Sequence, residues 1–105
     1  MADSTREQEL ISTATELFEA NKYKQVESII NQLILKNCKV PKIFQMLGTV
    51  YYDQGKFNKA IRAFKRALEL DPSFTDASLG LSIILNDLGK YEEGKISLKK
   101  IFSYR

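Results

Sequence analysis

The sequence predicts an all-α fold built from three helical hairpins that follow one another along the chain. Apolar residues recur at helical spacing, and residues that favour turns separate the amphipathic stretches. A turn of similar composition returns about every 34 residues. Each copy begins with a residue that tolerates a left-handed backbone and ends with an aromatic side chain that can pack into its hairpin. The three copies are Asn21-Lys22-Tyr23, Gly55-Lys56-Phe57 and Gly89-Lys90-Tyr91.

Composition limits the classes of function that the chain can have. The 105 residues are 44% hydrophobic and 28% charged, which is typical of one soluble domain, and the net charge is +3. Cys38 is the single cysteine and histidine is absent, which excludes an intramolecular disulfide and histidine-based catalytic triads and argues against the common zinc sites. We therefore expect no enzyme activity, no metal, no other cofactor and no small-molecule substrate.

The location predicted for the chain is cytoplasmic. Its first residues are polar and lack both the basic and the apolar region of a signal peptide. No apolar run approaches the length needed to cross a bilayer, so we expect no contact with a membrane.

The first hairpin is predicted at residues 5–36. Ser4 and Glu7 match a capping box, which starts a helix near residue 5, and Asn21 ends it after residue 20. A second helix, with a broad apolar face, is expected from about residue 23 to residue 36.

Two further hairpins follow. Pro41 suits the first turn of a helix because its missing N–H is not needed there, and Asp71-Pro72 ends the second helix of this middle hairpin. A fifth helix is expected at 75–88 and a sixth at 91–104. The sequence thus predicts six helices.

Residues 41–74 contain eight positions with a characteristic order and spacing, which are Phe44, Leu47, Gly48, Tyr51, Ala60, Phe64, Ala67 and Pro72. In that order and spacing they resemble a tetratricopeptide (TPR) repeat. The flanking hairpins keep the turn and the larger apolar positions but lose the small ones. The boundaries that follow are a cap segment at 1–6, a degenerate repeat at 7–40, a second repeat at 41–74, and a third at 75–105 that lacks a C-terminal capping helix.

The resemblance implies an α-solenoid, a right-handed superhelix in which the first helix of each hairpin lines a concave groove. In this family the groove binds the ligand. The matching positions here are Gln8, Ile11, Thr15, Phe18 and Glu19 in the first repeat, Lys42, Gln45, Thr49, Tyr52 and Asp53 in the second, and Asp76, Leu79, Ile83, Asn86 and Asp87 in the third.

The chemistry of these groove positions favours a particular kind of partner. Several are apolar or aromatic on a face that the repeats need not bury, and an acid recurs at the last position of each set. We therefore expect a peptide segment that is apolar and carries some basic charge. A competing interpretation is that Phe18 and Tyr52 fill space between repeats while the acids are an ordinary solvated row.

One TPR subtype, which clamps a C-terminal carboxylate, is not expected. The resemblance places its lysine, arginine and asparagine positions at residues that lack those side chains, and the acid among them would repel a carboxylate. The residues are Ile11, Thr15, Met46, Asp76 and Gly80.

The predicted function is a non-enzymatic adaptor or scaffold that binds a segment of another protein. The alternative is a small secretion-type chaperone of three repeats that holds an apolar cargo segment. An RNA-binding helical repeat is disfavoured, because no base-reading pair recurs in each unit. The basic residues of the convex side, such as Arg62 and Lys65, are interpreted as an ordinary solvated surface.

The last predicted helix carries apolar residues on more than one stripe, so something should cover it. We expect either a homodimer through this helix or a longer natural chain. The residues that would take part in self-association are Ile96, Ile101, Phe102 and Tyr104.

Overall fold

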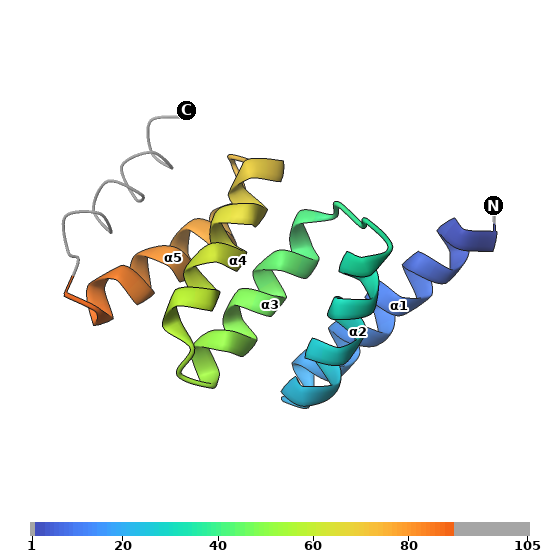
Figure 1. Cartoon of the computed structure of the whole chain (residues 1–105), viewed down its shortest axis with the longest axis horizontal. Coiled ribbons are helices and arrows are strands. Elements are labelled where there is room, and N and C mark those ends of the chain that lie inside the picture. Colours follow the sequence, from blue (N-terminus) through green and yellow to red (C-terminus); the bar gives the residue numbers. More distant parts are fainter. Residues whose placement is uncertain (1, 90–105) are drawn as a thin grey trace.

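The computed structural model describes residues 2–89, and side chains from residue 6 onward, as a chain of five α-helices (Figure 1). The helices are α1 (Ala2–Glu19), α2 (Tyr23–Leu35), α3 (Pro41–Asp53), α4 (Phe57–Leu70) and α5 (Thr75–Asp87). The second and fifth helices were predicted to within one residue at each end, the third begins at Pro41 as predicted, and the fourth ends just before Asp71 as predicted. The predicted sixth helix, with its residues for self-association, lies outside the described residues.

The helices form an all-α solenoid of TPR type. α1 pairs with α2 and α3 pairs with α4 as hairpins, and α5 packs against both α3 and α4. Figure 1 shows the two complete hairpins side by side along the long axis, with α5 following α4. Within residues 2–89, no helix is long and apolar enough to cross a membrane.

Three positions that follow a helix have the left-handed backbone that the sequence predicts. Asn21 has a φ of 62°, and Gly55 and Gly89 each have a φ of 78°. Asn37, which follows α2, also has a positive φ, of 61°, and was not predicted. Asparagine tolerates this region better than other residues with a Cβ, so both asparagines act as glycine does at the other bends.

The predicted start of the first helix was wrong. The helical backbone already begins at Ala2, so Ser4 lies inside α1 and does not cap it, and residues 2–6 belong to α1. Alanine is the best helix former, so Ala2 favours a helix that begins before the apparent capping box.

Phe64 of α4 is wedged between the backbones of α3 and α5. Its side chain is 2% exposed. A Cβ added at Gly48 would lie 2.8 Å from Phe64 Cε1, and one added at Gly80 would lie 2.5 Å from Phe64 Cζ. The two glycines therefore allow both helices to approach the ring more closely than any other residue type would. This contact fixes the spacing between the second repeat and α5.

The face of α1 that points away from α3 is polar. Its residues stand where α3 carries fully buried apolar side chains against the preceding hairpin. They are Glu9, Ser12 and Glu16, all exposed, in place of Ile43, Met46 and Val50, all 0% exposed. A polar outer face is typical of the terminal repeat of a solenoid.

Candidate functional site

A hydrogen bond joins α3 and α5 at two of the predicted groove positions. Tyr52, at the end of α3, donates its hydroxyl to Asp87 Oδ2, at the end of α5, over 2.6 Å. A short bond to a carboxylate is among the stronger hydrogen bonds in proteins. The groove positions of α3 and α5 therefore lie next to each other, as the TPR arrangement requires.

The hydrogen bond changes the acidity of Tyr52. Because the hydroxyl donates to a carboxylate, and because burial and the negative charge of Asp87 add to the effect, the pKa of Tyr52 is raised above its ordinary value of 10.0. Ionisation would remove the donor and place a second negative charge beside Asp87.

This effect can be measured by following the ring-carbon NMR signals of tyrosine through an alkaline titration. We expect Tyr52 to ionise above pH 10.0 in the wild type and at a lower pH in Asp87→Ala, because the acceptor and its charge are removed. Asp53→Ala is the control and should leave Tyr52 unchanged. Equal pKa values of Tyr52 in wild type and Asp87→Ala would contradict the bond.

Phe18 and Tyr52 also pack within their own hairpins. Phe18 contacts the turn aromatic Tyr23, and Tyr52 contacts the turn aromatic Phe57, each with ring centroids 5.6 Å apart. The same contact thus recurs in both repeats. Part of the role of these two side chains is therefore to hold each hairpin together, and Tyr52 in addition contacts α5 through Asp87.

Between α3 and α5 the predicted groove contains an apolar hollow of about 210 Å³. We call it the anchor hollow, and its lining residues are Thr49, Tyr52, Phe64, Gly80 and Ile83. Three of these are predicted groove residues. Phe64 and Gly80 were missed, although one signal was present: glycine at position 80 stands where the preceding repeat has a large side chain, Met46.

Apolar exposure in the groove is concentrated on α5. Leu79 is 44% exposed and Ile83 is 51% exposed, whereas Ile11 and Phe18 of α1 are half-buried and pack against the core. From the sequence, all four residues were expected to be exposed in the groove. In the structure the two residues of α5 are exposed beside the anchor hollow, whereas the two residues of α1 pack against the core.

The polar residues in the middle of the groove are largely engaged with their own helices. The hydroxyl of Thr15 donates to the carbonyl of Ile11 over 2.8 Å, and that of Thr49 donates to the carbonyl of Gln45 over 3.2 Å. Gln45 donates to Thr49 over 3.3 Å, and its Oε1 is buried without a partner among the described residues. The hydroxyl donors of both threonines are therefore used within their own helices and are not free to bind a ligand.

The acidic row is exposed. Glu19, Asp53 and Asp87 end the groove-facing sets of α1, α3 and α5, and Asn86 beside Asp87 is also exposed. Asp87 is fixed by Tyr52, so its position relative to the anchor hollow is defined.

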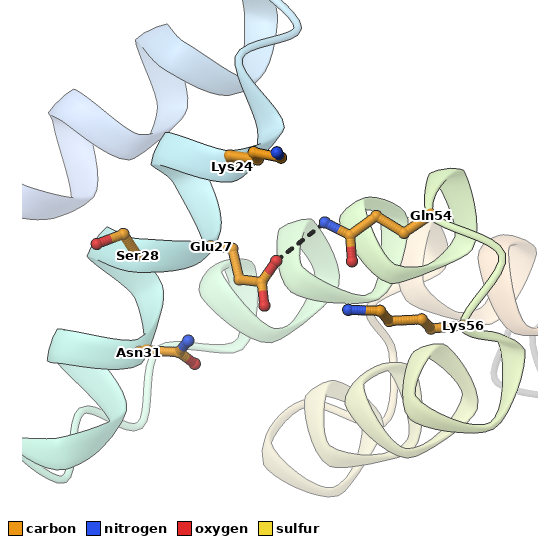
Figure 2. A pocket seen from close by; sticks show the side chains of 6 residues that line it. All are labelled: Lys24, Glu27, Ser28, Asn31, Gln54 and Lys56. Carbon is orange, nitrogen blue, oxygen red and sulfur yellow. Dashed lines mark hydrogen bonds between the residues drawn. The ribbon is translucent and has the colours of Figure 1, made fainter.

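A second, polar hollow lies on the side of α2 (Figure 2). Its volume is about 590 Å³, and its lining residues are Lys24, Glu27, Ser28, Asn31, Gln54 and Lys56. Figure 2 shows α2 facing the turn between α3 and α4 across it, with Gln54 Nε2 donating to Glu27 Oε1 over 2.9 Å. This bond ties the first repeat to the second outside the groove.

Cys38 is a core residue and not a reactive thiol. Its side chain is 5% exposed, and burial raises the pKa of the thiol. In the part of the chain that the structure describes, no group of three or more histidine, cysteine or acidic residues could hold a metal ion.

The fold and the groove define the class of the protein as a helical repeat of solenoid type. Comparison with known proteins gives the particular family: the sequence profile of the tetratricopeptide repeat matches residues 41–74. Together with the structural likeness described next, this match shows that the chain is a helical repeat of the TPR type, with one such repeat at residues 41–74.

Several known proteins are similar. "Uncharacterized protein MJ0572" of Methanocaldococcus jannaschii is 32% identical over 60 residues, which are 57% of this chain and 70% of that protein. The second TPR of Spaghetti (RPAP3), bound to the HSP90 peptide SRMEEVD, has a TM-score of 0.83 at 18% identity, with 100% of both chains covered. The crystal structure of MamA has a TM-score of 0.87 at 17% identity, with 97% of this chain and 60% of MamA covered. At these identities the two structures show the fold alone.

Proposed function

We propose that this chain is a non-enzymatic interaction module that binds a peptide or helical segment of another protein in the groove of α1, α3 and α5. The observation that carries the proposal is the exposure of Leu79 and Ile83 beside the anchor hollow. Exposed apolar side chains next to an apolar hollow are typical of a surface that a partner covers.

A solved relative of the same fold supports a peptide as the partner, since the second TPR of Spaghetti (RPAP3) is bound to the HSP90 peptide SRMEEVD. The peptide bound by this chain should differ in charge. SRMEEVD has more acidic than basic residues, whereas the groove here ends each helix with an acid and places Asp76 and Gly80 where a carboxylate clamp needs basic residues. We therefore expect a partner segment with basic charge.

The test is selection from a phage-displayed library of random short peptides with the purified chain as bait. We expect enriched peptides whose affinity falls about fivefold in Leu79→Ala, Tyr52→Ala and Phe18→Ala, because each truncation removes apolar contact area. Because Phe18 and Tyr52 also pack within hairpins, circular dichroism must show that each variant is folded. Leu35→Ala is the control, since Leu35 is 87% exposed on α2, away from the groove.

Two results would contradict the proposal. If the wild-type chain enriches no peptide, it is not a peptide-binding module. If enriched peptides bind all three folded groove variants as tightly as the wild type, the binding site is elsewhere. Synthetic SRMEEVD serves as the charge control and should bind more weakly than any selected peptide.

A small chaperone for an apolar cargo segment is the second candidate, and the exposure of Leu79 and Ile83 favours it as well. Mass spectrometry of the untagged protein purified from its natural cells discriminates the two. A cargo chaperone should carry one stoichiometric client that is insoluble alone, whereas an adaptor should not.

A further inference from the structure

The anchor hollow occurs at one of two equivalent places in the solenoid. Moving its five lining residues back by one repeat, about 34 residues, gives the same positions at the junction of the first and second repeats. These are Thr15, Phe18, Ile30, Met46 and Thr49. There the space is filled, because Met46 is 0% exposed and the Thr15 hydroxyl lies 4.0 Å from its sulfur.

Gly80 opens the corresponding space between α3 and α5. With no side chain at position 80, the ring of Phe64 lies directly against the α5 backbone and forms the floor of the hollow. Its volume of about 210 Å³ exceeds the roughly 150 Å³ of an apolar cavity that binds benzene. The hollow therefore has room for one large aliphatic side chain or one phenyl ring.

An acid is held at the rim of the hollow. Tyr52 lines it and holds Asp87 through the 2.6 Å hydrogen bond, and Asp53 follows Tyr52 in the sequence. Among the groove positions the acids outnumber the bases, although the whole chain has a net charge of +3. The acids are Glu19, Asp53, Asp76 and Asp87, and the base is Lys42.

From this arrangement we infer that the anchor hollow is the subsite that determines ligand choice. It takes one large apolar side chain of a partner protein segment in which a lysine or arginine stands close by and pairs with Asp87 or Asp53. The apolar lining selects the first residue by burial, and the acidic rim selects the second and rejects acidic segments. The inference rests on the proposed function and names the ligand class of the same groove.

The chain itself supplies the side chains with which to fill the hollow. The double variant Phe64→Ile/Gly80→Met copies the Ile30 and Met46 pair that already packs at the preceding junction. We expect this variant to fold, as judged by circular dichroism and thermal melting, and to bind peptides selected by the wild type at least about tenfold more weakly, because the anchor side chain is excluded.

Two single variants test the same subsite without altering the core. Ile83→Ala removes half-exposed apolar area from the lining and should weaken binding about fivefold, with Ile34→Ala, 37% exposed on α2, as its control. Asp87→Asn should weaken binding about threefold at low salt and less at high salt, with Glu16→Gln on the outer face of α1 as its control.

The sequences of the selected peptides give the direct readout. The inference expects a leucine, isoleucine, methionine or phenylalanine with a lysine or arginine within two positions of it. Peptides that lack this pair, or full affinity for both Ile83→Ala and a folded double variant, would overturn the inference while leaving peptide binding intact. Failure of the wild-type chain to enrich any peptide would instead overturn the proposed function.

Discussion

Replacing Phe64 with alanine should lower the free energy of unfolding by about 3–5 kcal/mol. The ring is 2% exposed and contacts the backbones of α3 and α5 from α4, so its loss leaves a void where three helices meet. Neither Gly48 nor Gly80 has a side chain that could move into the space. Chemical denaturation followed by circular dichroism measures the change.

Phe57→Ala is the matched control for Phe64→Ala. Phe57 is half-buried at the start of the same helix, where it contacts Tyr52, so its truncation should cost clearly less. Equal losses for the two phenylalanines would show that Phe64 does not organise the junction between the repeats.

Replacing Gly80 with alanine should also destabilise the fold, by about 1–3 kcal/mol. Alanine is the better helix former by up to about 1 kcal/mol, so propensity alone predicts the opposite sign. The clash outweighs the propensity, because the new Cβ would lie 2.5 Å from Phe64 Cζ and the ring also lies close against the backbone at Gly48.

A double-mutant cycle separates these two effects. In a Phe64→Ile background the ring is absent, so Gly80→Ala should cost little or become stabilising. The same denaturation measurements on wild type, both single variants and the double variant give the coupling. If Gly80→Ala stabilises the wild-type chain, the close approach of α5 to the ring is wrong.

The fold could be predicted from the sequence because it depends on local chemistry that repeats. The bends at Asn21 and Gly55 need a left-handed backbone, and few residue types provide one. The start of α1 could not be placed, since a capping box at Ser4 competes with a helix that continues through Ala2, and the local signal does not decide between them.

The groove positions could be listed from the resemblance. Which of them are free to contact a ligand could not be predicted. Whether Phe18 or Ile83 is free to contact a ligand depends on side chains from other helices, which the spacing within one helix does not report. The anchor hollow depends on Gly80 and Phe64 together, which come from different helices. A comparison of equivalent positions between repeats, Met46 with Gly80, could have indicated it.

The polar face of α1 has a consequence for assembly. Solenoid repeats can in principle add end to end between molecules, and a head-to-tail contact that does not close into a ring grows into an open filament. Such growth needs an apolar surface at the leading end that matches the trailing end of the next copy. Glu9, Ser12 and Glu16 offer none, so the stacking of another copy of the chain onto the outer face of α1 is disfavoured.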